Sequence, residues 1–188
     1  RFKTFMIFGI TASGKTEIYM RCLQDIIQKG GRGLVLVPEI SMTPILLGRF
    51  RERFGSAAVT IHSALTAKER RQVWYGIKNG RYRIVIGPRS AIFLPIPDLK
   101  MIVVDEEHDP SYKEHQQALK YNARDAAVMR GKIENLIIVL GSATPQVESF
   151  HNASVGKYEL ITLKERIDNR PLPGADIVDL KNEFKRII

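Results

Sequence analysis

The segment FMIFGITASGKTEIYM, residues 5–20, contains the pattern that decides the fold of this chain. An apolar run ends at Gly9, the loop GITASGKT fills residues 9–16, and a segment with helical periodicity follows. A strand, the pattern G-x-x-x-x-G-K-[ST] and a helix, in this order, are typical of a phosphate-binding loop. Backbone N–H groups at the start of such a helix bind phosphate oxygens. The residues predicted to bind a nucleotide are Gly9, Ile10, Thr11, Ala12, Ser13, Gly14, Lys15 and Thr16.

Two side chains of this loop have predicted chemical roles. Lys15 is expected to reach the β- and γ-phosphates of ATP, and the hydroxyl of Thr16 is expected to coordinate Mg²⁺. The alternative is a chance match in a glycine-rich turn. The strand before the loop and the helix after it argue against that alternative.

A second motif, MIVVDEEHD at residues 101–109, places acidic side chains at the exit of an apolar run. Carboxylates this close repel one another, so folding alone would not favour them. In phosphate-loop enzymes a second strand presents an acidic residue to the magnesium ion. We therefore predict that Asp105 binds Mg²⁺ and that Glu106 polarises the water that attacks the γ-phosphate. With Lys15 they form the catalytic set of an ATP hydrolase; the alternative is a strand whose last residues are merely solvated.

Apolar runs and helix-like segments alternate along the chain. The runs that read as strands are residues 2–9, 33–39, 57–63, 82–88, 99–107 and 136–144. The segments that read as helices are residues 15–31, 43–55, 66–80, 122–133 and 145–153. Strands that are apolar throughout and alternate with helices indicate a parallel sheet buried on both faces. The expected fold class is α/β, a doubly wound, mainly parallel sheet with helices on both faces.

The composition fits one globular domain that works on a polyanion. The chain has 188 residues, of which 44% are hydrophobic, and it carries 29 Lys and Arg against 20 Asp and Glu. The net charge of +9 favours nucleic acid as a partner, although solvated basic helix faces would give the same balance. No segment reads as a membrane span or a signal peptide. The single Cys22 and the scattered histidines predict neither a disulfide nor a zinc site, so we expect a cytoplasmic protein.

The end of the chain differs from the rest. Residues 164–188 are polar and punctuated by Pro and Gly, with one β-like run, ADIVDL, at residues 175–180. We expect residues 1–163 to form an ATP-binding lobe, and residues 164–188 to form a linker and the start of a truncated second lobe. The abrupt start within a strand also predicts a piece of a larger protein.

Several motifs together resemble one family, the bacterial primosomal replication-restart DNA helicases of superfamily 2. These motifs are GITASGKTEIYM, VPEISMTP, IHSALTAKER, GPRSAIFLP, VDEEHDPSYKEH, YNARDAA and LGSATPQVES. The resemblance covers nearly the whole chain. It implies a RecA-like P-loop fold, the first lobe of a 3′-to-5′ DNA helicase that acts at stalled forks and takes part in primosome assembly.

The resemblance also implies roles for further residues. His108, Ser142 and Thr144 would couple the state of the nucleotide to the DNA side. Residues 110–125 correspond to a loop that the family uses to couple DNA binding to hydrolysis. The residues that would contact DNA are Pro38, Glu39, Ser41, His62, Ser63, Arg89, Ser90, Tyr112 and Tyr121. For two of them an ordinary structural role is the alternative, His62 as a loop histidine and Arg89 as a surface ion-pair partner.

The chain departs from the family pattern at several positions. Ala12 stands where glycine is expected and is tolerated there if its φ is negative. Pro88 stands where threonine is expected, and Ala118 and Leu119 stand where a glycine and a tryptophan are expected. The coupling role of the loop at residues 110–125 is therefore less secure than that of the phosphate loop.

The family implies partners that the 188 residues do not supply. They are a second RecA-like lobe with an arginine finger, a zinc module and an N-terminal DNA-binding region. Forked or single-stranded DNA, primosome proteins and single-strand-binding proteins are the expected external partners. Two alternatives stay open: a nucleotide- and DNA-binding module without activity of its own, and a lobe of another superfamily 2 translocase or RNA helicase.

Overall fold

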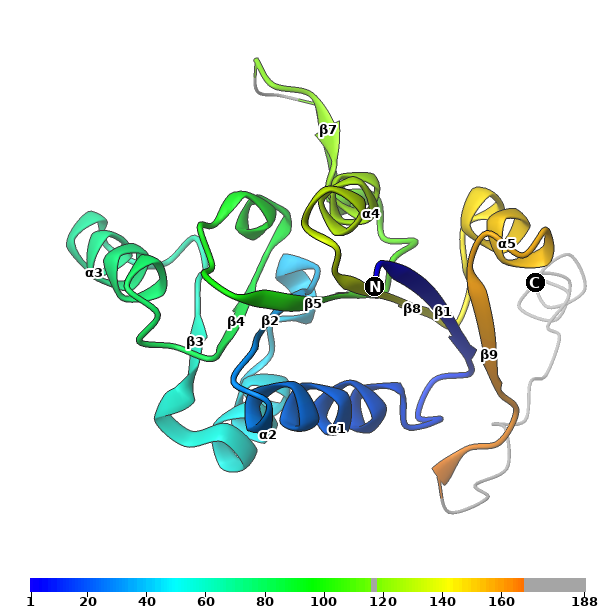
Figure 1. Cartoon of the computed structure of the whole chain (residues 1–188), viewed down its shortest axis with the longest axis horizontal. Helices are drawn as coiled ribbons and strands as arrows, with labels where there is room; N and C mark the ends of the chain where they lie inside the picture. The colour runs from blue at the N-terminus through cyan, green and yellow to red at the C-terminus, as the bar shows by residue number, and fades with distance from the viewer. Residues whose placement is uncertain (116–117, 168–188) are drawn as a thin grey trace, which may run out of the picture.

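The computed structural model describes residues 1–115 and 118–167, and its main feature is one parallel sheet (Figure 1). The strand order is β3-β4-β2-β5-β8-β1-β9, and every neighbouring pair is parallel. The strands are β1 Lys3–Gly9, β2 Arg32–Leu36, β3 Ala58–Thr60, β4 Ile84–Gly87, β5 Leu99–Asp105, β8 Ile137–Ser142 and β9 Glu159–Leu163. The predicted doubly wound α/β fold is confirmed.

Helices cover both faces of the sheet. Helices α1 and α2 lie on one face, and α4 and α5 lie on the other (Figure 1). The helices are α1 Lys15–Gln28, α2 Pro44–Phe54, α3 Ala67–Lys78, α4 Ala123–Glu134 and α5 Val147–Ser154. Short 3-10 turns are η1 Glu39–Ser41, η2 Gly55–Ala57, η3 Arg89–Phe93 and η4 Pro110–Tyr112. All five helices predicted from the sequence are present.

Local chemistry explains where two of the helices begin. Thr43 caps α2 by accepting a hydrogen bond from Leu46 N, and Pro44 stands at the first helical position, where its missing N–H costs nothing. Thr66 and Glu69 form a capping box at the start of α3. Each cap therefore fixes the residue at which its helix begins.

Two hydrophobic cores lie on opposite faces of the sheet. Alternation along a strand sends neighbours to opposite faces, so Leu34 and Leu36 join one core while Val35 joins the other. The first core also contains residues of α3 and α4, and the second contains residues of α1 and α2. Because both faces are covered, the central strands need apolar residues at every position.

The edge strand β9 was not predicted from the sequence. It pairs with β1, but four of its five residues are exposed, so it lacks the continuous apolar run of a central strand. The predicted linker and second lobe at 164–188 fall mainly outside the described residues, as does the β-like run at 175–180. Within the ranges that the structure covers, no helix combines the length and the apolar character needed to cross a membrane.

A close contact between α1 and β8 restricts which residue can stand at position 141. Tyr19 of α1 is buried, and its hydroxyl occupies the space where a Cβ on Gly141 would lie. Gly141 pairs with Asp105 of β5 on one side and with Ile7 of β1 on the other. Only a residue without a side chain therefore fits at this position of β8.

We predict that Gly141→Ala lowers the free energy of unfolding by about 1–3 kcal/mol, because overpacking in a dense core forces neighbours to move. Tyr19→Phe removes the overlapping oxygen, so the double variant should be less destabilised than the sum of the two single changes. Urea unfolding measures both effects. Gly48→Ala is the control, since nothing lies near a Cβ at that helical glycine, and it should be neutral or stabilising. A Gly141→Ala cost near zero would contradict the contact.

Candidate nucleotide site and nucleic-acid face

The phosphate loop joins β1 to α1 and adopts two left-handed backbone conformations. Gly14, at the N-cap of α1, has φ of +91°, which only glycine adopts without strain. Ala12 has φ of +66°. The condition under which alanine is tolerated, a negative φ, is therefore not met at Ala12. Strain of this kind persists only where surrounding structure enforces it.

Lys15 lies at the base of the loop. Its side chain is buried, and Nζ donates a hydrogen bond of 2.9 Å to Gly9 O. An ammonium group has three donors, so two are left for phosphate oxygens. A cavity of about 440 Å³ opens in front of the loop and is bounded by residues 11–16 and by Asp105 and Glu106. The structure thus brings the three predicted catalytic residues together with the predicted phosphate-binding residues.

Asp105 is at the end of β5 and faces this cavity. Burial raises the pKa of its carboxyl group to about 6, and the charge of Glu106 adds to that shift, while Tyr19 and Lys15 oppose it. A divalent cation would reverse this balance, because it favours the ionised carboxylate. The Thr16 hydroxyl and the Asp105 carboxylate are oxygen donors of the kind that Mg²⁺ takes, so the residues present fit this ion.

Glu106 also has a strained backbone. Its φ is +47°, directly after the last residue of β5. Non-glycine residues with positive φ cluster at functional sites, where the strain aims a side chain. Glu106 lines the cavity, and its Oε2 lies 3.6 Å from Nδ1 of His108. The conformation supports a role for this carboxylate in the cavity itself.

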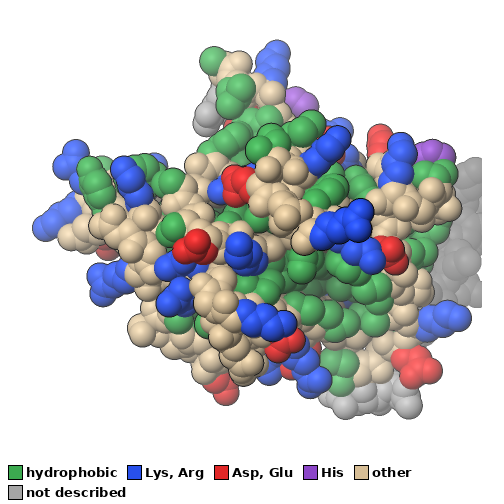
Figure 2. Space-filling model, viewed as in Figure 1, with side chains coloured by type: hydrophobic (Ala, Val, Ile, Leu, Met, Phe, Trp, Pro, Cys, Tyr) green, Lys and Arg blue, Asp and Glu red, His purple; other side chains and the backbone are tan. Residues whose placement is uncertain are grey.

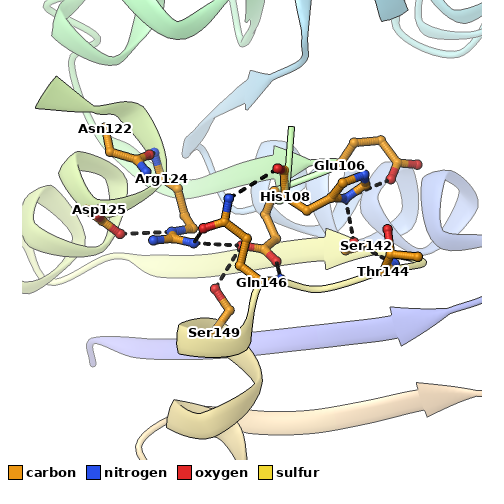
Figure 3. A network of polar contacts seen from close by, with 10 residues as sticks. Glu106, His108, Asn122, Arg124, Asp125, Ser142, Thr144, Gln146 and Ser149 are labelled. Atoms are coloured by element: carbon orange, nitrogen blue, oxygen red, sulfur yellow. Dashed lines mark hydrogen bonds and ion pairs between the residues drawn. The ribbon is translucent and has the colours of Figure 1, made fainter. Parts of the chain in front are cut away.

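The three predicted coupling residues form one contact group beside Glu106 (Figure 3). The Oγ of Ser142 lies 2.7 Å from Nδ1 of His108 and accepts a hydrogen bond of 2.9 Å from Thr144 N. Ser142 ends β8, and His108 follows β5, so the group bridges two neighbouring strands. A movement of Glu106 would therefore be transmitted through His108 to Ser142 at the end of β8.

Glu107, which sequence analysis left without a role, is the anchor of a second network. Its partners Arg124, Gln146 and Ser149 are labelled in Figure 3. Its fully buried carboxylate accepts hydrogen bonds from Gln146 N (2.8 Å), Ser149 Oγ (2.8 Å) and Arg124 Nη1 (3.3 Å). Arg124 also donates to Asp125 and to Gln146 Oε1. The network fastens the starts of α4 and α5 to the motif DEEH. The run of three acidic residues did not indicate that the side chain of Glu107 is buried.

The candidate nucleic-acid face lies at the same edge of the sheet, beyond β2, β3 and β4. His62, Ser63, Ser90 and Glu39 line a cavity of about 310 Å³ there. Trp74 also lines it, and 36% of its surface is exposed. Lys and Arg side chains gather around α3 at the left of Figure 2. The basic residues of this helix are Lys68, Arg70, Arg71 and Lys78.

Arg89 is committed to neighbouring groups within the protein. Its guanidinium donates to Ser111 O (2.9 Å), to Lys113 O (3.2 Å) and to the buried Glu114 carboxylate (2.7 Å). Arg89 therefore connects η3 to the start of the segment 110–125. Its contacts are those of the alternative role named above, an ion-pair partner within the protein. Tyr121 lines the adjoining cavity of about 190 Å³, and its ring meets that of Phe93 edge-on at 4.9 Å.

Tyr112 corrects one expectation. It is only 1% exposed, and its hydroxyl donates a hydrogen bond of 2.6 Å to Asp105 O. A ring enclosed in this way cannot stack on a base, so the expected contact of Tyr112 with DNA does not fit the structure. Tyr112 instead supports the end of β5. Pro38, which precedes η1, is buried, and Ser41, the last residue of η1, is half-buried. Neither residue lines the two cavities.

The loop at residues 110–125 is partly a hairpin. Strands β6 Lys113–Glu114 and β7 Tyr121–Asn122 pair antiparallel, and Asn122 then caps α4 through Arg124 N. Leu119, which stands where a tryptophan was expected from the resemblance, is 62% exposed. An exposed apolar side chain at this position can contact a partner without offering an aromatic face.

We predict that Ala12→Gly raises the free energy of unfolding by about 1 kcal/mol, since it relieves the positive φ while adding some entropy to the unfolded chain. Thermal or urea unfolding measures the change. Ala126→Gly is the matched control, because Ala126 lies within α4, where glycine should cost about 1 kcal/mol. Equal destabilisation by both changes would contradict the left-handed conformation of Ala12.

Comparison with known proteins places this geometry in a family. A sequence model of the DEAD/DEAH box helicase family matches residues 2–153. The chain is 43% identical over 183 residues to replication restart protein PriA of Bacillus subtilis, covering 97% of this chain and 23% of that protein. It is 44% identical over 181 residues to the protein of the same name in Rickettsia conorii, covering 96% and 28%. The chain thus spans about a quarter of the length of these relatives.

Solved structures share the fold. The helicase domain of Pyrococcus furiosus Hef superposes with a TM-score of 0.63 at 19% identity, covering 89% of this chain and 36% of that chain. RecG bound to a three-way DNA junction superposes with a TM-score of 0.59 at 21% identity, covering 98% and 24%. The fold is that of RecA-like helicase domains. The family model, which covers residues 2–153 and thus most of the sequence, shows that the chain belongs to the DEAD/DEAH box helicase family.

Proposed function

We propose that this chain is the ATP-binding motor lobe of a DNA helicase that hydrolyses ATP, unwinds DNA 3′ to 5′ at stalled forks and restarts replication. The observation that carries the proposal is the shared cavity of Lys15, Thr16, Asp105 and Glu106. The similarity to PriA proteins supports the assignment to replication restart.

The residues divide the chemistry among them. The N–H groups of the phosphate loop and Lys15 hold the β- and γ-phosphates, and Thr16 and Asp105 hold Mg²⁺. Mg²⁺ supplies charge that offsets the phosphate oxygens. Glu106 orients a water molecule and accepts its proton as the water oxygen bonds to the γ-phosphorus. The bond from that phosphorus to the bridging oxygen of ADP breaks, which gives ADP and phosphate.

The same edge of the sheet provides the path for DNA. The cavities beside His62 and Tyr121 lie at the ends of β3 and β4 and next to the loop at residues 110–125. The group of His108, Ser142 and Thr144 joins Glu106 to the end of β8 at the same edge. In the cell we expect a cytoplasmic protein that also uses a second lobe, a zinc module, an N-terminal DNA-binding region, and primosome and single-strand-binding proteins.

A binding module without turnover of its own is the second candidate. The cations that line the 440 Å³ cavity within the described part of the chain are Lys15 and Arg49. An arginine finger from a second lobe contributes about 10³–10⁵ in kcat to phosphoryl transfer. The fold itself does not separate DNA from RNA helicases, since Mss116p domain 2 bound to an RNA duplex superposes with a TM-score of 0.60 at 11% identity.

Lys15→Ala should abolish measurable binding of a non-hydrolysable ATP analogue, because it removes the charge that meets the β- and γ-phosphates. Calorimetric titration in Mg²⁺ measures this. Glu106→Gln is the matched control, since it changes a carboxylate of the same cavity that acts on water, and it should bind the analogue about as well as the unchanged chain. If Lys15→Ala keeps the affinity of the unchanged chain, the nucleotide assignment is wrong.

The isolated 188-residue chain should hydrolyse ATP at a barely detectable rate, because a missing arginine finger corresponds to roughly 4–7 kcal/mol of transition-state stabilisation. A steady-state assay with and without single-stranded DNA measures the rate. Any DNA affinity should fall steeply as salt rises, since it comes from phosphate contacts. Robust, DNA-stimulated turnover would show that the catalytic set is complete within this chain.

A further inference from the structure

The nucleotide cavity has a cation that none of the sequence motifs predicted. Arg49 of α2 lines the 440 Å³ cavity with Lys15, Asp105 and Glu106. It also lines the adjoining cavity of about 470 Å³, together with Thr16 and Glu17. Its side chain is exposed and has neither a hydrogen-bond nor an ion-pair partner within residues 1–115 and 118–167.

Contacts between α1 and α2 fix where Arg49 stands. Arg53, one turn later on α2, donates a hydrogen bond of 2.9 Å to Glu17 Oε1. Residues four apart on a helix lie on one side, with Cβ atoms about 5–6 Å apart. Glu17 directly follows Thr16 in the first turn of α1. Arg49 is therefore held beside the start of α1, where the phosphate loop ends.

The neighbouring acid does not neutralise Arg49. Glu17 accepts hydrogen bonds from Arg21 Nε and Arg53 Nη2, both of 2.9 Å, and these two arginines lower the pKa of its carboxyl group. The negative charge of Glu17 is thus already balanced by Arg21 and Arg53. A guanidinium left uncommitted at the wall of a phosphate cavity is available to a ligand.

The charge in the cavity calls for a second cation. A nucleoside triphosphate with one Mg²⁺ keeps a net negative charge, and the ionised forms of Asp105 and Glu106 add to it. Lys15 offsets one negative charge, and one of its N–H groups already donates a hydrogen bond to Gly9 O. A guanidinium forms paired, charge-assisted hydrogen bonds with phosphate oxygens. We propose that Arg49 binds the triphosphate of the nucleotide from the α2 side of the cavity, which rests on the proposed ATP-binding function.

The test compares Arg49→Ala with Arg51→Ala. Both changes remove one positive charge from α2, but residues two apart lie about 200° apart around a helix, so Arg51 faces away from α1. The 188-residue chain is titrated by calorimetry with a non-hydrolysable ATP analogue and with tripolyphosphate, both in Mg²⁺. Tripolyphosphate has no base or sugar, so it reports contacts to phosphate alone.

Arg49→Ala should weaken the binding of both ligands about 10- to 100-fold, the range expected for a lost charge-assisted hydrogen bond. Arg51→Ala should weaken both less than about threefold, and Arg49→Lys should restore part of the affinity. Equal losses in the two alanine variants would show a long-range charge effect and overturn the proposal. A loss for the ATP analogue alone would place Arg49 at the base and also overturn it.

The lysine of the phosphate loop separates this inference from the function on which it rests. If Lys15→Ala loses nucleotide binding while Arg49→Ala keeps it, only the role of Arg49 is wrong. If Lys15→Ala keeps binding, the nucleotide site itself is wrong, and the inference falls with it.

Discussion

The parallel register of β5, β8 and β1 is the constraint on which the site depends. Asp105 pairs with Gly141, and Gly141 pairs with Ile7, two residues before the phosphate loop. This alignment brings the ends of three strands to one edge, so that a carboxylate from β5 and an ammonium group from α1 share a cavity. The buried Tyr19 fits over Gly141 and leaves no room for a side chain there. A shift of one residue in any of these pairs would separate Asp105 from Lys15.

The acidic motif is stable because its carboxylates have different environments. Asp105 and Glu106 line the cavity, where a cation and a phosphate ligand can balance them. Glu107 is enclosed and is matched by Arg124 and two other donors. Asp109 accepts a hydrogen bond from Ser111 N and caps η4. The repulsion expected from the sequence is thus reduced because Glu107 is enclosed among its own donors, apart from the cavity that Asp105 and Glu106 line.

Sequence patterns predicted the buried strands of this protein well. They predicted poorly the exposed strand and the side chains that form hydrogen bonds within the protein. The six apolar runs are strands because both faces of the sheet are covered, whereas β9 is exposed and carries no such signal. The phosphate loop followed from its spacing, but the φ of Ala12 depends on tertiary contacts that local preference does not report. Tyr112 and Arg89 carry the right chemistry for DNA, and only their neighbours in space show that both are engaged within the protein.

The hydrogen bond from Ile167 N to Ala12 O, 3.1 Å long, ties the chain that leaves β9 to the phosphate loop. The side chain of Ile167 also lines the nucleotide cavity and lies near Gly14. A single backbone hydrogen bond contributes about 0.5–1.5 kcal/mol, whereas β9 is held to β1 by a run of paired residues. Under tension along the chain the tie at Ala12 would therefore break before the sheet does. Loss of this hydrogen bond would free the Ile167 side chain from the nucleotide cavity, while the paired residues of β9 and β1 stay together.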